Sequence, residues 1–518
     1  MLTTRSSRKK LPKVLSLLAL IVSIISTGTP ATGKTNVRET SLRKIRTIVI
    51  IFEENRSFDN LYGLYPGANG ILSDAEGRPA DMKAYRQLDR DGLTPLEHLP
   101  PVWNTPAAAA GELGFIAKMP NGPFRIDAPP GAASSMKPDR ITPDLVHRFY
   151  NNQMQINGGR NNMFASWSDA GGLCMGYYDG SSMQMWQLAR KYTLCDNFFM
   201  GAFGGSFLNH IWLISARAPF FPDAPADMKS AVDGKGTALV LAPDSPASAL
   251  SGPAKYAADK PLTPDGYAVN TMQPSYQPSG IPPAQGGNQA LADPAKNPLP
   301  PQDYRTIGDA LSDKGVAWAW YSGAWNESHR DRKIIYQQGT SNFQAHHQPF
   351  NYFRRFDPTT PAGAEQRKLH LKDYADLQEA IRKGSLPAVV FYKPEGKLNQ
   401  HPGNCDVISA DRHVAGLVRE LQKSPQWKNM AIIVTYDENG GLWDHVAPPS
   451  GDRWGPGMRI PAIVISPFAR KHFVDHTYYD TTSILKFITK RFGLEPLAGV
   501  REKAGDLVNV FDFAKNKE

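Results

Sequence analysis

Apolar runs of strand length alternate along the chain with amphipathic segments of helix length, a pattern that favours a mostly parallel sheet covered by helices on both faces. Strands are expected at 45–52, 192–199, 316–321, 387–392, 430–436 and 461–466. Helices are expected at 181–191, 207–216, 304–314, 371–384, 411–424 and 480–492. The predicted fold class is therefore α/β, with a mostly parallel central sheet.

The last of these helices has the clearest end signals. Asp480 can cap its first turn and Gly493 can terminate it. Between them, Ile484, Phe487 and Ile488 fall on one helical face. A helix over 480–492 is the best-defined element that the sequence predicts.

Two long stretches, 64–140 and 219–303, are rich in Pro and Gly and show little periodicity. Loops of this length in a compact enzyme usually shape an active site or are disordered. The chain contains no evident internal repeat, and its length suits one large α/β domain or two smaller ones. We expect a single catalytic domain over residues 32–518, with irregular insertions near 64–140 and 219–303.

The N-terminus has the three regions of a secretory signal. Five basic residues precede an apolar run at 14–25, and small and polar residues follow around 29–31. The run is too short to span a bilayer, which needs roughly 20 apolar residues. Residues 1–31 are therefore predicted to be a signal peptide that exports the protein to the periplasm or the extracellular space, with no stable membrane span.

Charge and cysteine content narrow the class of partner. Removal of residues 1–31 lowers the formal net charge from +9 to about +4. No nucleic-acid partner is implied, and a mildly cationic surface suits small anionic substrates. The three cysteines permit at most one disulfide, and their spacing makes no zinc site.

Residues 28–35, GTPATGKT, match the phosphate-loop pattern of nucleotide hydrolases. The supposed strand before this loop belongs to the basic N-terminal segment, and cleavage near residue 31 would cut through the loop. An ATPase is therefore a weak alternative.

Two predicted strands end in neighbouring carboxylates. The run 48–52 is followed by Glu53, Glu54 and Asn55, and the run 432–434 leads to Asp437 and Glu438. Ligands of open parallel sheets bind at the carboxyl ends of the strands, so these side chains are expected on one edge. Alternation along a strand makes Glu53 a weaker candidate than Glu54.

Glu54, Asn55, Asp437 and Glu438 together offer hard oxygen ligands. Such a set favours one divalent cation, Ca²⁺, Mg²⁺ or Mn²⁺ rather than Zn²⁺. The structural alternative is that the acids cap helices or pair with Arg56 and nearby lysines.

The segment 192–216 predicts a strand, a Gly-rich turn and an apolar helix that begins at Ser206. A helix N-terminus favours phosphate binding, and a nearby cation would lower the pKa of the hydroxyl, which would make Ser206 an activated nucleophile. The plain alternative is that Ser206 is an N-cap. A serine-esterase elbow is excluded because Leu208 stands where that motif requires glycine.

Histidines supply candidate acid–base groups. His147, His347 and His401 lie in polar, aromatic or Gly/Pro-containing sequence, where imidazolium groups could bind phosphate and protonate a leaving alkoxide. Taken singly, a histidine in such a position is more often a surface or structural residue. His445, which follows the second acid pair, could be a ligand, a group that orients a ligand, or a structural residue.

These motifs together resemble the bacterial acid phosphatase and phospholipase C superfamily of phosphoesterases, which has an alkaline-phosphatase-like α/β fold. The matching segments are EENRSFDNLYG (53–63), HRFYNNQMQINGG (147–159), FMGAFGGSFLNH (199–210), HHQPFNYF (346–353), NQHPG (399–403) and TYDENGGLWDHVAPP (435–449). The resemblance covers nearly all of the chain after residue 31.

The resemblance implies roles for the candidate residues. Its metal ligands correspond to Glu54, Asn55, Ser206, Asp437 and Glu438, with Ser206 also the nucleophile. The histidines around the phosphate correspond to His147, His347 and His401.

We therefore expect a secreted phosphomonoesterase that works through a phosphoserine intermediate, with protonated histidines and an acidic optimum. The chain ends about 25 residues after its last predicted helix, which favours the acid phosphatase branch. One alternative is a phospholipase C that acts on phosphatidylcholine-type lipids and contacts phospholipid head groups. Another is a non-catalytic secreted metal-binding protein.

Overall fold

The computed structural model describes residues 41–105, 111–336 and 342–514. At its centre is an eight-stranded sheet in the order β11-β4-β10-β9-β1-β8-β6-β7. The bounds are β1 Thr47–Glu53, β4 Thr193–Cys195, β6 Trp318–Ser322, β7 Leu371–Asp373, β8 Val389–Lys393, β9 Met430–Tyr436, β10 Ala462–Ile465 and β11 Phe473–Asp475. Two short pairs lie outside the sheet, β5 Phe198–Phe199 with β12 Tyr479–Asp480, and β2 Phe124–Arg125 with β3 Gly176–Tyr177.

The sheet is mostly parallel. β1 runs parallel to both neighbours, β8 and β9, whereas β10 is antiparallel to β9 and β4. The helices are α2 Phe58–Tyr62, α4 Phe149–Ile156, α5 Phe164–Trp167, α6 Gln184–Lys191, α7 Ser206–Ser215, α8 Ile307–Asp313, α9 Trp325–Arg330, α10 Pro361–His370, α11 Tyr374–Lys383, α12 Val407–Lys423 and α13 Thr481–Phe492. This arrangement confirms the predicted α/β class.

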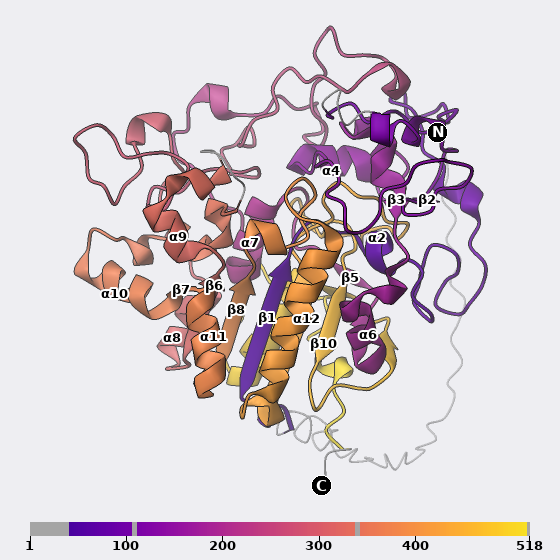
Figure 1. Ribbon diagram of the computed structural model, residues 1–518. Helices are drawn as coiled ribbons and strands as arrows, with labels where there is room; N and C mark the ends of the chain where they lie inside the picture. The colour runs from indigo at the N-terminus through magenta and orange to yellow at the C-terminus, as the bar shows by residue number, and fades with distance from the viewer. Residues whose placement is uncertain (1–40, 106–110, 337–341, 515–518) are drawn as a thin grey trace, which may run out of the picture.

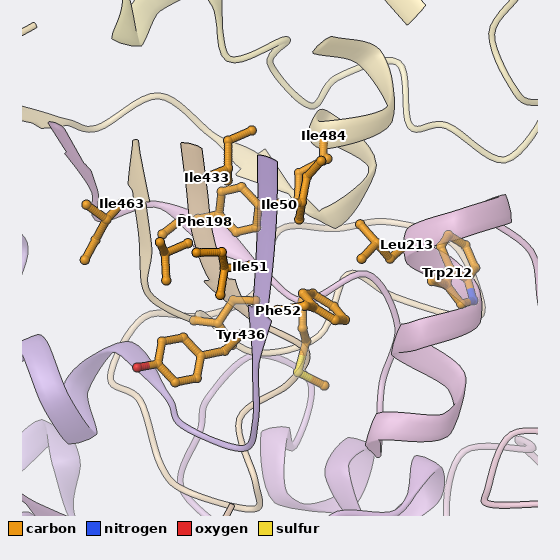
Figure 2. Packing of buried hydrophobic residues seen from close by; sticks show 14 of the residues in the cluster. Ile50, Ile51, Phe52, Phe198, Trp212, Leu213, Ile433, Tyr436, Ile463 and Ile484 are labelled. Carbon is orange, nitrogen blue, oxygen red and sulfur yellow. The ribbon is translucent and has the colours of Figure 1, made fainter. Parts of the chain in front are cut away.

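The central strands are apolar because helices cover them on both sides. Every residue of β1 is buried, and Figure 1 shows α11 and α12 in front of the sheet. In Figure 2, Phe52 and Ile51 lie on opposite sides of β1, and Phe52 is on the side of Trp212 and Leu213 of α7. α13 packs against α7, and α6 packs against α12.

The predicted elements agree with the structure to within a few residues, with two informative differences. The stretch 192–199 divides into β4 and β5. The strand near 461–466 is antiparallel, so its end does not join the edge where β1 and β9 end. α13 has the predicted ends, with Asp480 accepting from Thr482 N–H and Gly493 in the left-handed conformation at φ 63°.

Within the described residues, the stretch 219–303 forms only short 3₁₀ turns and isolated bridges. Figure 1 shows it at the end of the sheet toward which the β1 arrow points. Asn270 from this insertion accepts a hydrogen bond from Phe149 N–H at 3.0 Å. The stretch therefore folds against α4 beside the carboxyl edge of the sheet.

The predicted signal peptide and the phosphate-loop match lie outside the described residues, and the single-domain assignment stays a prediction. None of the helices within the described ranges combines the length and the apolar character that a membrane crossing requires. Cys174, Cys195 and Cys405 are buried free thiols.

Candidate active site

The two carboxylate-bearing strand ends meet because β1 and β9 are neighbours. Their register pairs Glu53 with Tyr436, so Glu54 and Asp437 emerge side by side. Asn55 adopts φ 63°, a left-handed conformation that asparagine tolerates better than most residues. In this conformation its N–H donates to Asp437 Oδ1 at 3.2 Å, which ties the two ends together.

Glu53 and Glu54 have different surroundings. Glu53 lies with Tyr62 and Tyr436 in a small internal cavity, and burial raises the pKa of its carboxyl group well above the usual value. The Glu54 carboxylate contacts Lys393, His347 and Asn399. The placement follows the strand alternation that made Glu54 the better candidate.

Ser206 is the first residue of α7, and Gly205 takes the N-cap position. The Ser206 hydroxyl donates to Asn55 Oδ1 at 3.1 Å and makes no capping bond to the helix. The N-cap alternative for Ser206 therefore does not apply. The hydroxyl stands at the positive end of the helix dipole, next to the end of β1.

Glycines allow the turn before α7 to approach the chain near His147. A Cβ atom at Gly204 would lie 2.5 Å from Phe149 N, and one at Gly205 would lie 2.8 Å from His147 O. Asn209 holds the turn from inside α7, since its Oδ1 accepts from Ala202 N–H at 2.9 Å. Asn209 was missed by the sequence analysis, although it is a polar residue within an apolar helix.

Ser206 opens into a pocket of about 400 Å³. Residues that share its lining are His147, Arg148, Asp144, Asp169, Phe207, Tyr336, His346 and His401. Val269, Asn270 and Thr271 come from the 219–303 insertion, so that insertion helps to shape the site. A larger pocket of about 1150 Å³ near the end of α13 contains none of these residues.

The rings of His147 and His401 are held in the same way, because the Nδ1 atom of each contacts a backbone carbonyl oxygen. His147 Nδ1 is 2.5 Å from Leu145 O, and His401 Nδ1 bonds to Pro402 O. Their rings lie edge to face with centroids 5.6 Å apart. A backbone carbonyl occupies each Nδ1, and His147 Nε2 also lies 3.4 Å from Asn55 Nδ2, which leaves His401 Nε2 for chemistry.

The structure places His347 differently from His147 and His401. His347 is fully buried, and its Nε2 is 2.9 Å from Glu54 Oε1. Its neighbour His346 lines the pocket. Burial lowers the pKa of both rings, and the Glu54 carboxylate opposes this shift at His347. His346 is a pocket residue that sequence reasoning missed.

Glu54 is held by groups that the sequence analysis did not select. Asn399 Nδ2 donates to Glu54 Oε2 at 2.5 Å, and Lys393 Nζ lies 3.3 Å from Glu54 Oε1. Burial alone would raise the pKa of Glu54, but Lys393 and His347 outweigh it and hold the pKa well below its usual value. The sequence does contain a signal for Lys393, because this lysine ends an apolar strand in the same way as the acid pairs end theirs.

Asp437 and Glu438 add two more buried carboxyl groups to this edge of the sheet. Burial and the nearby Glu54 charge raise the pKa of Asp437 to about 7. Burial, followed by the Asp437 charge, raises the pKa of Glu438 well above its usual value. Asp437 Oδ2 and Glu438 Oε1 find no hydrogen-bond donor within the described residues. Unpaired buried carboxylates are costly, so these oxygens fit a bound cation.

Ligand atoms from Glu54, His210 and Asp437 lie within 4.8 Å of one another, as do those from Glu54, His346 and His347. These acidic and histidine groups could hold a metal ion. Glu438 belongs to neither set: its Oε1 is 3.8 Å from His147 Nε2, and its Oε2 accepts from Gly440 N–H. The expected all-oxygen set thus has histidine nitrogens as close neighbours.

His445 lies beside α2 and contacts acidic and arginine side chains there. Its Nδ1 lies 2.7 Å from Asp59 Oδ2, in a buried network centred on Arg459. Arg459 pairs with Asp59 at 2.8 Å and with Asp444 at 3.0 Å. This network joins α2 to the loop that follows β9, so it braces the two segments that carry the acid pairs.

Residues 45–495 match the model of the Phosphoesterase family, and the chain belongs to that family. It is 25% identical over 510 residues to phospholipase C B of Mycobacterium tuberculosis, an alignment that covers 91% of this chain and 78% of that protein. It is 23% identical over 522 residues to non-hemolytic phospholipase C of Burkholderia pseudomallei, covering 92% of this chain and 60% of that protein. Family and relatives identify the chain as a phosphoric ester hydrolase, as expected from the sequence.

Among solved structures, a protein of the alkaline phosphatase superfamily from Vibrio parahaemolyticus aligns with a TM-score of 0.30 and 11% identity, covering 74% of this chain and 75% of that one. The fold assignment rests on the sheet order described above. The names of the relatives fit the phospholipase C alternative better than the acid phosphatase expectation.

Proposed function

We propose that this protein is an exported, metal-dependent phospholipase C that cleaves phospholipids with a cationic head group through a covalent intermediate on Ser206. The observation that carries the proposal is the position of Ser206, at a helix N-terminus, bonded to Asn55 and open to a pocket lined by three histidines. The same catalytic geometry serves any phosphate ester, so a preference for lipids depends on other groups of the pocket.

Glu54, Asn55, Ser206, Asp437 and Glu438 would hold one divalent cation, with His210 as a neighbouring nitrogen donor. Such an ion supplies a lowered pKa for the Ser206 hydroxyl and neutralisation of phosphoryl charge. The oxygen ligands favour Ca²⁺, Mg²⁺ or Mn²⁺.

The reaction then needs two displacements at phosphorus. Ser206 Oγ, entering as the alkoxide, forms a bond to phosphorus while the bond from phosphorus to the glycerol oxygen breaks. We assign to His401 Nε2 the proton that the departing alkoxide takes up, because its Nδ1 is already bonded to Pro402 O. In the second step, neutral His401 takes a proton from water, which attacks phosphorus and releases Ser206 as the alkoxide.

Other pocket groups position the phosphoryl group. His346 is buried beside the pocket, and neither of its ring nitrogens has a hydrogen-bond partner within the described residues. It can therefore donate to a phosphoryl oxygen. The free N–H groups at the start of α7 add donors that point toward Ser206.

Two carboxylates favour a cationic head group over a phosphate dianion. Asp144 and Asp169 line the pocket, and the ion pair of Asp144 within the described ranges is to His147 at 3.6 Å. Arg148, the pocket arginine, is already paired with Asp259 at 2.6 Å. A substrate with a positive head group gains from these acids, whereas a dianionic monoester is repelled.

Activity on phosphatidylcholine vesicles and on 4-nitrophenyl phosphate distinguishes a phospholipase C from a phosphomonoesterase. We expect diacylglycerol release from the vesicles, with the higher kcat/KM for the lipid. The double variant Asp144→Asn, Asp169→Asn should raise KM for the lipid about tenfold, since one attraction near the protein surface is worth roughly 1 kcal/mol or more. Its activity on 4-nitrophenyl phosphate, which has no cationic group, should stay level or rise.

The matched control is Asp244→Asn, which neutralises an exposed acid paired with Lys255 in the same chain. Equal KM changes in this control and in the double variant would contradict a head-group role. A higher kcat/KM for the monoester in the unaltered enzyme would return the assignment to acid phosphatase.

Removal of the ion gives an independent check of the proposed metal site. We expect a chelator to abolish turnover and to lower the thermal unfolding midpoint, because Asp437 Oδ2 and Glu438 Oε1 then remain buried without a hydrogen-bond donor. Added Mn²⁺, Mg²⁺ or Ca²⁺ should restore both properties. Calorimetry with and without chelator measures the effect, and an unchanged unfolding midpoint would argue against a resident ion.

A further inference from the structure

Lys393 is the last residue of β8 and lies at the carboxyl edge of the sheet, next to β1. Its side chain has no solvent exposure, and its Nζ is 3.3 Å from Glu54 Oε1. The same carboxylate oxygen is 2.9 Å from His347 Nε2. A buried ammonium group is costly unless it is paired, and Glu54 is its ion-pair partner within the described residues.

Two candidate ligand sets share Glu54. One adds His210 and Asp437, and the other adds His346 and His347. Two ions bridged by Glu54 are therefore conceivable from ligand positions alone. The position of Lys393 favours one ion, because its ammonium group already pairs with the Glu54 carboxylate that the two sets share.

The charges at this buried edge of the sheet also favour one ion over two. With a cation bound, the proposed ligands Glu54, Asp437 and Glu438 bring three ionised carboxylates to this edge and Lys393 brings one ammonium, and all four side chains are fully buried. The remainder is two negative charges, which one divalent cation neutralises. A second divalent cation would leave a buried excess of positive charge, which is strongly unfavourable in a low dielectric.

We propose that Lys393 is a built-in cation that takes the place of a second metal ion beside Glu54 and so fixes this site at one ion per chain. Its consequence is that His346 stays free of metal and faces the substrate pocket. The inference rests on the metal site proposed above and concerns how many ions that site admits.

Cobalt content tests the inference without relying on turnover. Enzyme loaded with excess Co²⁺ and then desalted should retain about one ion per chain, whereas Lys393→Met should retain about two, the second bound by Glu54, His346 and His347. Lys393→Arg keeps the charge and should retain one. Adding His346→Ala to Lys393→Met should return the content to one, and the visible absorption of Co²⁺ should change only in Lys393→Met, which gains nitrogen ligands.

Lys393→Met is to be produced with Co²⁺ present, because loss of the ammonium leaves Glu54 short of a partner until an ion binds. A folded Lys393→Met that still retains one ion would overturn the inference, since a merely structural lysine changes stability and not ion content. If that variant fails to fold, the unaltered enzyme decides: two ions overturn the inference and one ion upholds it. No ion at all would instead refute the proposed metal site.

Discussion

Replacement of Ser206 by alanine should lower kcat/KM by about 10⁴-fold or more, because a nucleophile cannot be replaced by the groups around it. The fold should survive, since Ser206 makes no capping bond that α7 needs. Steady-state kinetics on phosphatidylcholine vesicles measure the loss. Intact-mass analysis after acid quenching should show the head-group phosphate on the unaltered enzyme, localised to the peptide with residue 206, and none on Ser206→Ala.

Ser215→Ala is the matched control. Ser215 ends the same helix, is also buried, and donates its hydroxyl to Ile211 O at 2.8 Å, far along the helix from the pocket. Activity should remain within about twofold of the unaltered enzyme, because the variant loses one neutral hydrogen bond worth roughly 1 kcal/mol of stability. Labelled protein that carries phosphate at another residue would refute the role given to Ser206.

The second large effect concerns stability. Arg459→Met should lower the free energy of unfolding by about 3–5 kcal/mol, because it leaves Asp59 and Asp444 buried without their cation. Urea denaturation followed by tryptophan fluorescence measures the loss. Arg453→Met is the control, since Arg453 pairs with Asp265 where both side chains are about half exposed, and its cost should stay below about 1 kcal/mol.

The cost of Arg459→Met should depend on pH in a defined direction. Arg459 faces Asp59, Asp444, Asp196 and His445. Burial raises the pKa of Asp444 to about 6, so Asp444 carries its charge above pH 6 and takes up a proton below it. The unfavourable unpaired charge in the variant therefore weakens as pH falls, and the stability gap should be smaller at pH 5 than at pH 7.5. A gap that widens toward pH 5 would contradict the assignment.

The sequence predicted the scaffold well because its signals are local. The apolar runs that became β1, β8 and β9 are continuous, as strands buried on both faces must be. Asp480 and Gly493 marked the ends of α13. α4 was missed because nearly all of its residues are buried, so it shows no polar face and no helical period.

The site was predictable in its strand ends and less so in its supporting groups. Glu54, Asn55 and Asp437 follow from strand ends on one edge, and Ser206 from a Gly-rich turn before a helix. The contacts of Lys393 and Asn399 with Glu54 span 339 and 345 positions of the sequence, and no local pattern encodes such pairings. The choice between His346 and His347 depends on which ring turns toward Glu54, which only the packed structure defines.

The pairing of β1 with β9 also has a consequence for biogenesis. Asn55 and Asp437 are 382 positions apart yet directly bonded, so a chain that is still being synthesised holds only Glu54, Asn55 and Ser206 of the five proposed ligands. The full proposed set can therefore bind an ion only after the segment with Asp437 and Glu438 has folded beside β1. Under the proposed metal site, the compartment in which this final folding step takes place would supply the ion, and its ionic composition would influence which metal is bound.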